Sequence, residues 1–120
     1  MNWTRQYEDA ADAEYARCLA RPVEGLLDDL RRGRTGDYFQ IWRVLGERGS
    51  AAQVAWPLYD FLLSDRPYLD RYHCANALLR VLDCTAFEAV QLSANWSTRP
   101  EALLQLRARV EAAAGAGPER

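Results

Sequence analysis

Residues 42–46 read Trp42-Arg43-Val44-Leu45-Gly46, and the pattern returns 37 residues later as Leu79-Arg80-Val81-Leu82-Asp83. An apolar segment precedes each copy, at 26–30 and at 58–62, and these two segments lie 32 positions apart. A period in the thirties with two helices in each unit is typical of helical solenoids. The repeat therefore predicts stacked helical hairpins in the middle of the chain.

Outward from this repeat, apolar residues recur every three or four positions, which is the spacing of amphipathic helices. No segment alternates with period two, so we expect no strand. Short turns rich in Gly, Pro and Ser separate the segments and favour antiparallel neighbours. The sequence predicts an all-α fold, a compact α-α superhelix of six to seven helices, at about 4–20, 22–33, 37–46, 50–63, 68–83, 85–95 and 98–112.

Several boundaries and buried faces follow from residue type. We expect Asp37 and Ser50 to cap the third and fourth helices, because their side-chain oxygens accept free first-turn amides. Pro57 either kinks the fourth helix or marks its start at Trp56. The buried faces are expected to include a stripe in each of three other helices: Trp3, Tyr7, Ala11 and Tyr15 in the first; Leu69, Tyr72 and His73 in the fifth; Phe87 and Val90 in the sixth.

The stretch from Leu45 to Leu82 resembles the HEAT-repeat family. The matching elements are Leu45-Gly46, Val54-Ala55-Trp56-Pro57-Leu58, Phe61-Leu62-Leu63-Ser64-Asp65, Arg71 and Ala75-x-Ala77-Leu78. By this resemblance Asp65 takes the family's turn position and Arg71 its helix-start position, while the aromatic Trp56 departs from the usual pattern. The resemblance covers the middle third of the chain strongly and residues 22–95 weakly. We expect one HEAT-like domain over 1–114, and the Ala/Gly-rich composition with Pro118 predicts a flexible tail at 115–120.

The amino-acid composition limits the classes of function that this protein can have. A chain of 120 residues, 49% hydrophobic and 27% charged, fits one globular domain. A net charge of −2 argues against nucleic-acid binding. The polar start and the lack of any apolar run of about 20 residues predict a cytoplasmic protein with no membrane partner. Three cysteines and one histidine cannot supply four-ligand zinc spacing, so we expect no metal and no cofactor.

The sequence also offers little for catalysis. His73 and Cys74 are adjacent, and adjacent side chains on a helix diverge by about 100°. Cys18 or Cys84 could approach His73 only through the fold. No P-loop, nucleophile elbow, zinc-protease or dinucleotide motif occurs. We therefore expect His73 to be a core or half-buried residue, the cysteines to be reduced, and the protein not to be an enzyme.

A partner-binding surface is predicted instead on the second helices of the hairpins, which line the concave face in HEAT-like arrays. Acidic and aromatic residues gather there, and together they suit a basic protein partner. The candidate residues are Asp28, Asp29, Trp56, Tyr59, Asp60, Asp65 and Tyr68. The alternative is a solvated helix face with no role in binding.

Two functions follow from these observations. Small HEAT-like proteins resemble immunity proteins of bacterial polymorphic toxin systems, and the phrase Asp70-Arg71-Tyr72-His73-Cys74-Ala75 is similar to theirs. That resemblance implies a protein that occludes the active site of a toxin with a basic surface. The alternative is a structural or regulatory scaffold, which could self-associate into a dimer through its terminal helices.

Overall fold

A computed structural model describes residues 3–117 of the chain, and this part contains seven α-helices and no strand. The helices are α1 (Trp3–Leu19), α2 (Val23–Arg31), α3 (Gln40–Arg48), α4 (Ala51–Leu62), α5 (Tyr68–Val81), α6 (Ala86–Asn95) and α7 (Pro100–Ala114). The predicted all-α class is confirmed. None of these helices combines the length and the apolar character that a bilayer-spanning helix requires.

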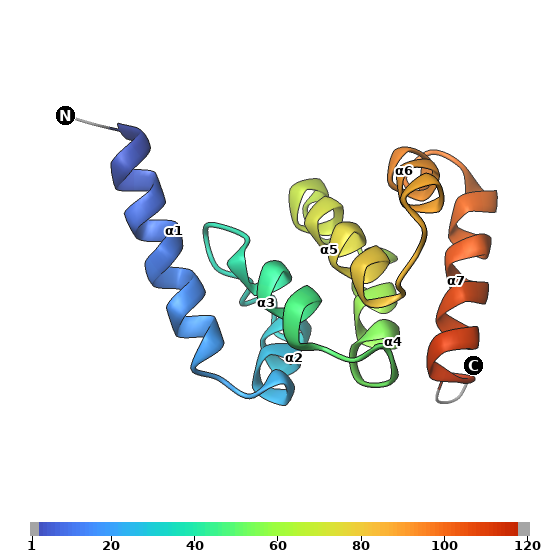
Figure 1. Ribbon diagram of the computed structural model, residues 1–120, viewed down its shortest axis with the longest axis horizontal. Coiled ribbons are helices and arrows are strands. Elements are labelled where there is room, and N and C mark those ends of the chain that lie inside the picture. Colours follow the sequence, from blue (N-terminus) through green and yellow to red (C-terminus); the bar gives the residue numbers. More distant parts are fainter. Residues whose placement is uncertain (1–2, 118–120) are drawn as a thin grey trace.

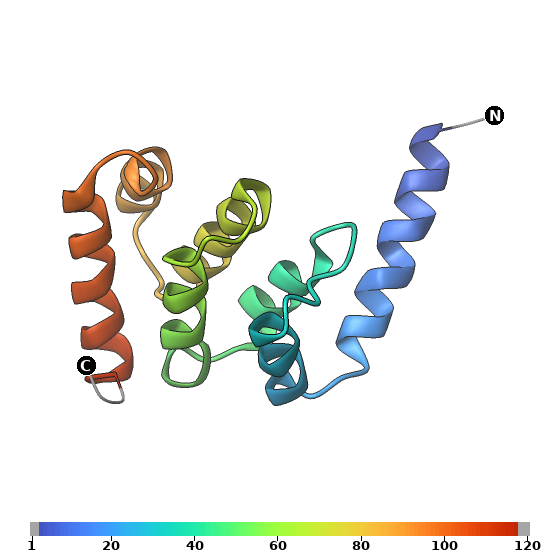
Figure 2. The same ribbon diagram turned by 180° about the vertical axis from the view of Figure 1, so that it is seen from behind.

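The helices form two rows, as Figure 1 shows. In one row α3 packs between α1 and α5, and in the other α4 packs between α2 and α7. Figure 2 shows α4 between α2 and α7 from behind. Helix α5 lies on α4, which joins the rows, and α6 contacts α5 and α7 at the end of the array. The molecule is elongated along the stacking direction, with principal extents of 47 × 28 × 26 Å.

The core lies between the two rows. Its fully buried side chains come from the first copy of the repeat, from the apolar segments that precede both copies, and from the helices around them: Leu26, Leu27, Val44, Leu45, Val54, Leu58, Leu62, Cys74, Leu78, Trp96, Leu106 and Val110. Full burial of one such leucine stabilises the fold by about 1.5–3 kcal/mol. The first copy of the repeat and the two preceding apolar segments thus contribute much of the core, whereas Val81 and Leu82 of the second copy are only half-buried.

Helix α4 begins as the sequence predicts, because the Ser50 hydroxyl accepts the Gln53 backbone N–H at 3.3 Å. Pro57 lies inside this helix, which continues past it to Leu62. The expectation that the helix starts at Trp56 is therefore wrong. Helix α6 begins with a capping box that Thr85 and Glu88 form together.

The start of α3 differs from the prediction. Asp37 does not cap it; the residue before the first turn is Phe39, in the left-handed conformation at φ 60°. The capping oxygens come from Glu14, a carboxylate of α1 that is only 6% exposed. Glu14 accepts backbone N–H groups from Asp37 at 2.8 Å, Tyr38 at 3.1 Å and Gln40 at 3.0 Å. One acid of α1 thus satisfies the first amide of α3 and two amides of the loop ahead of it.

Gly36 makes this approach of the carboxylate possible. Its φ of 79° is a conformation that other residues adopt at a cost. A Cβ atom at this position would lie 2.5 Å from Oε1 of Glu14. Glycine is therefore required here for both backbone conformation and space.

Several residues expected in buried faces are exposed. Trp3 and Tyr7 on the first half of α1 are 77% and 55% exposed, because that half extends beyond the loop ahead of α3. Leu69, Tyr72, Phe87 and Val90 are also exposed. Helix α6 lies at the end of the array, where α5 and α7 cover only one side of it. Helical periodicity finds an apolar stripe, but it does not show how much of that stripe a neighbour covers.

The chain after α7 is partly described. Of the predicted tail at 115–120, residues 118–120 lie outside the described residues. The carbonyl of Gly115 accepts the indole N–H of Trp56 at 2.8 Å. The first residue of the predicted tail is thus bound to α4.

Candidate functional site

The predicted acids of α2 are both engaged in ion pairs. Asp28 pairs with Arg32 at 3.0 Å, and Asp29 pairs with Arg21. In both pairs the guanidinium neutralises the charge of the carboxylate beside it. This helix therefore presents much less negative charge than its sequence suggests.

The two predicted aromatics of α4 face α7. Trp56 is 7% exposed and donates its indole N–H to Gly115, and Tyr59 is 4% exposed and donates its hydroxyl to the Leu103 carbonyl at 3.3 Å. The two rings also meet edge to face, 5.8 Å apart. Both residues therefore join α4 to α7, and their rings are not open to a partner.

The other three predicted residues lie apart. Asp60 is exposed and lines a groove of about 440 Å³ between α2 and α4, whose lining also includes Trp56, Arg31 and Arg66. Asp65 is exposed in the turn after α4. Tyr68 starts α5 and stacks on Trp96, with ring centroids 5.8 Å apart. The predicted surface is thus divided over several places, and the hollow that Asp60 lines also carries basic residues.

A different groove is formed by the other row, and we call it the α3 groove. It has a volume of about 440 Å³ and lies over α3 between α1 and α5, and Figure 1 shows α3 set between these two helices. Its lining is Tyr7, Tyr38, Phe39, Gln40, Trp42, Arg43, Gly46, His73, Asn76, Ala77 and Arg80. The loop before α3 brings aromatic side chains to one end, and Arg80 of α5 lies at the other.

Ring contacts fix the aromatic end of the α3 groove. Tyr7 meets Tyr38 edge to face at 5.2 Å, and Phe39 stacks on His73 at 4.4 Å with an angle of 19°. Phe39 also has the positive φ described above, which is rare for a bulky residue. Strained backbone conformations of this kind persist where the surroundings impose them, and they cluster at functional sites. The strained backbone of Phe39 therefore lies at the α3 groove.

Gln40 adds an unsatisfied polar atom to this end of the groove. Its Nε2 donates to the Tyr38 carbonyl at 3.0 Å, which fixes the orientation of the amide. Its Oε1 is buried and accepts no hydrogen bond from the described residues. Buried acceptors are nearly always paired, and an unpaired one costs about 1–3 kcal/mol.

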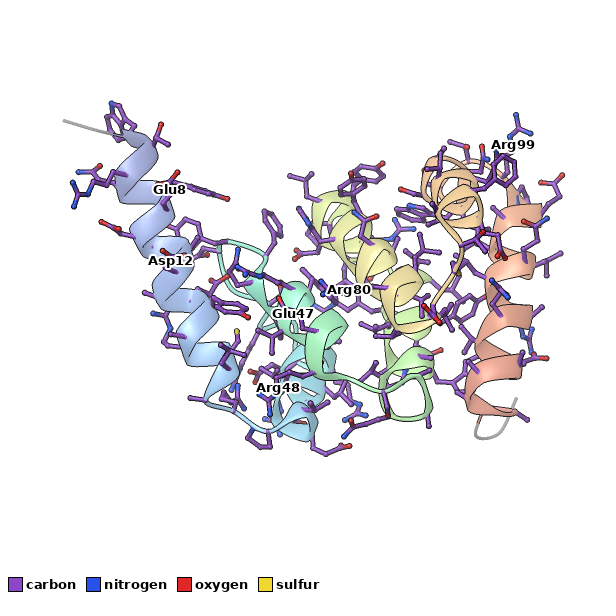
Figure 3. All side chains as sticks on the ribbon, in the orientation of Figure 1. Glu8, Asp12, Glu47, Arg48, Arg80 and Arg99 are labelled. Carbon is purple, nitrogen blue, oxygen red and sulfur yellow. The ribbon has the colours of Figure 1, made fainter. Side chains whose placement is uncertain are left out.

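Charged residues surround the groove. The Arg43 guanidinium lies 3.9 Å from the centroid of the Tyr15 ring and bonds Glu47 at 2.9 Å. The Tyr15 hydroxyl donates to Glu47 at 2.8 Å; this bond raises the pKa of Tyr15 and, with Arg43, lowers the pKa of Glu47. In Figure 3, Glu8 and Asp12 lie along α1, and Glu47 and Arg80 lie between α1 and α5. Carboxylates thus follow the α1 side, and Arg80 carries the charge on the α5 side.

His73 lines this groove without a neighbouring reactive thiol. Burial lowers its pKa below the ordinary 6.5, and the charge of Asp70 opposes that shift in part. The adjacent Cys74 is buried and donates its thiol to the Leu58 carbonyl at 3.1 Å, and burial raises the pKa of that thiol. Among residues 3–117, no group of three or more His, Cys, Asp or Glu residues is arranged to hold a metal ion.

The position of His73 predicts a pH dependence of stability. Between the lowered folded pKa and the ordinary value of 6.5, the unfolded chain binds more protons than the folded one, so stability falls as pH falls through this window. We expect urea unfolding to give a lower free energy at pH 5.5 than at pH 7.5, and a smaller difference for His73→Gln. His73 is the single histidine of the sequence, so its proton resonance gives the folded pKa directly. A folded pKa at or above 6.5 would contradict the stacked, partly buried position.

The sequence contains a partial signal for the α3 groove. The aromatic positions Tyr7, Tyr38 and Phe39 were visible, but helical spacing favours burial for such residues. Their exposure depends on how far α1 extends beyond α3, and the positive φ of Phe39 depends on the distant Glu14.

Comparison with known protein families, with curated proteins and with solved structures finds no match for this chain.

Proposed function

We propose that this chain is a HEAT-like protein-binding module, most concretely an immunity protein that occludes the active site of a bacterial toxin. We assign the α3 groove as its binding surface. This choice replaces the second-helix surface, because two of that surface's aromatics are buried and two of its acids are paired.

One observation carries the proposal: the α3 groove presents aromatic rings that are accessible and already fixed in place. Tyr7 is 55% exposed although it packs on Tyr38, and Phe39 is held against His73. Interface hot spots are rich in tyrosine, and side chains ordered before binding lose little entropy when the complex forms. A hollow of this kind suits a protein segment.

Two features support the resemblance to HEAT repeats. The helices stack in two rows, each helix packing on its neighbours in the row. Arg71, which takes the family's helix-start position, donates its Nε to the Leu62 carbonyl at the end of α4 at 3.0 Å. This bond joins one hairpin to the next, as the resemblance implies.

We propose binding rather than catalysis, and a cytoplasmic location. The Cys74 thiol next to His73 is buried and bonded to a backbone carbonyl, and burial raises its pKa, so the nucleophilic thiolate is disfavoured. An immunity protein needs only a rigid complementary surface, and such a protein would meet its toxin in the cytoplasm.

The test is co-expression with the product of a neighbouring toxin-like gene, followed by binding measurements with that purified protein. We expect the chain to restore growth and to bind the toxin domain directly. Tyr7→Ala should weaken binding by about tenfold or more, the loss typical of an interface aromatic. The matched control is Leu104→Ala, another exposed large side chain but on α7, and it should change affinity less than about threefold.

Two results would contradict the proposal. Cells that die despite co-expression would remove the immunity function. A wild-type affinity for Tyr7→Ala, together with rescue, would remove the α3 groove as the binding surface.

The second candidate is a scaffold that dimerises through its terminal helices. It is favoured by the exposed Phe87 and Val90 on α6, at the end of the array. Light scattering distinguishes the two functions. A dimer that Phe87→Ser converts to a monomer would support the scaffold. A protein that is monomeric at every concentration would contradict the hypothesis of a dimeric scaffold.

A further inference from the structure

Helix α1 buries little apolar surface against the rest of the array. Of its side chains only Ala11 and Glu14 are buried, and neither belongs to the apolar core that joins the two rows. Tyr15 and Cys18 pack against that core but are only partly buried. Apolar burial is the main favourable term in folding, so this helix is held less firmly than the helices of the core.

Polar contacts with α3, its principal neighbour, fasten α1 instead. The guanidinium of Arg48, the last residue of α3, donates from Nη1 to the carbonyls of Leu19 at 2.9 Å and Arg21 at 3.0 Å. Figure 3 shows Arg48 near the end of α1, where the chain turns into α2. In the second half of α1, the Tyr15 hydroxyl donates to Glu47. Helix α1 is thus attached along α3 by a few hydrogen bonds.

The aromatic end of the α3 groove is built by this same helix. Tyr7 lines the groove and meets the ring of Tyr38 at 5.2 Å. Glu14 accepts the backbone N–H groups of Tyr38 and Gln40. Phe39 lies between these two residues, and its left-handed backbone persists only where its surroundings impose it. Without α1 the groove loses one wall, and the loop loses the carboxylate that shapes it.

We infer that α1 undocks from the array as one unit, and that the α3 groove is formed only while α1 is docked. This inference rests on the proposed function and names how its binding surface is regulated. A partner that binds the groove selects the docked state, so its apparent affinity falls in proportion to the docked fraction. By linkage, the bound partner stabilises α1 at residues that it does not touch.

Native-state hydrogen exchange in low urea tests the inference without a partner. The reporting amides are those of Arg17 in α1, Gln40 at the start of α3 and Leu78 in α5. We expect the Arg17 and Gln40 amides to open together, at a lower free energy than the Leu78 amide, which requires global unfolding. A Gln40 amide that exchanges only with global unfolding, or that stays protected while Arg17 exchanges, would overturn the inference.

Arg48→Met loosens α1 at a position that does not line the groove. We expect the Arg17 and Gln40 amides to exchange faster by a common factor of about tenfold, although Gln40 lies about 12 Å from Arg48 along α3. The matched control Arg107→Met removes an exposed arginine of α7 and should change these rates less than about twofold. A faster Arg17 amide with an unchanged Gln40 amide would show that the loop does not follow α1, and the inference would fail.

Tyr59→Phe distinguishes a separate unit from global unfolding. It deletes a hydrogen bond between α4 and α7, which the docked and the undocked states both retain. In this variant the Leu78 amide should exchange about fivefold faster, and the Arg17 and Gln40 amides should keep the wild-type rate. Equal acceleration of all these amides would mean that α1 unfolds only with the whole domain, which contradicts the inference.

Binding of the toxin domain separates this inference from the proposed function. A partner in the α3 groove should slow the Arg17 amide by the same factor as the Gln40 amide, although Arg17 does not line the groove. If the toxin domain binds while the Arg17 amide keeps its unbound rate, the inference fails and the proposed function stands. If the exchange results hold but the toxin domain binds no form of the chain, the proposed function alone fails.

Discussion

Glu14→Gln is expected to lower the free energy of unfolding by about 2–4 kcal/mol. The substitution keeps the size of the side chain but replaces one acceptor oxygen with an NH₂ group that faces backbone N–H donors. Asp37, Tyr38 and Gln40 all donate to this carboxylate, and the position is only 6% exposed. Water therefore cannot replace the lost acceptor, and the first turn of α3 loses its cap. Urea denaturation monitored by circular dichroism measures the change.

Asp12→Asn is the matched control for this prediction, because Asp12 is an exposed acid on the same helix. We expect it to change stability by less than about 0.5 kcal/mol. If Glu14→Gln were as mild as the control, the carboxylate would not be holding the loop ahead of α3. Gly36→Ala provides an independent check, since its Cβ would displace Oε1 of Glu14.

Trp56→Ala is expected to be at least as severe, with a loss of about 3–5 kcal/mol and a melting temperature lower by roughly 10–20 °C. The indole is buried between α4 and α7, so its removal leaves a cavity and frees the Gly115 carbonyl. Differential scanning calorimetry gives both the midpoint and the enthalpy.

Tyr59→Phe separates packing from hydrogen bonding in the same interface. It deletes only the hydroxyl that donates to Leu103, so we expect a loss of about 1 kcal/mol. For both residues we expect stability to change without a specific loss of partner affinity in the folded fraction. A Trp56→Ala protein that is fully stable but no longer binds its partner would support the second-helix surface, predicted from the sequence, as the binding surface.

The all-α fold could be predicted because its signals are local. The repeat at 42–46 and 79–83 lies in helices α3 and α5 and their ends, and the Ser50 cap depends on residues three positions apart. Helical periodicity and first-turn chemistry need no knowledge of the rest of the chain. Element type and most boundaries were therefore accessible from the sequence.

The arrangement of the groove depends on contacts between distant residues, and these leave no local pattern. Glu14 caps a helix that begins 26 positions later, so Asp37 was the reasonable but wrong choice. Trp56 resembled a surface aromatic beside Asp60, and its burial depends on α7, far along the chain. Pairing of Asp29 with Arg21 depends on how the turn before α2 folds. Acid content by itself could not locate the surface charge.

The contact between α4 and α7 also has a consequence for biosynthesis. The indole of Trp56 meets its acceptor 59 residues later in the chain, and Tyr59 meets its own 44 residues later. At about 5–20 residues per second, a ribosome needs roughly 3–12 s to add those 59 residues. During this interval the α7-facing side of α4 has no covering helix. The nascent chain thus exposes two large aromatics to chaperones, and a transcript truncated before α7 would yield a product prone to aggregation.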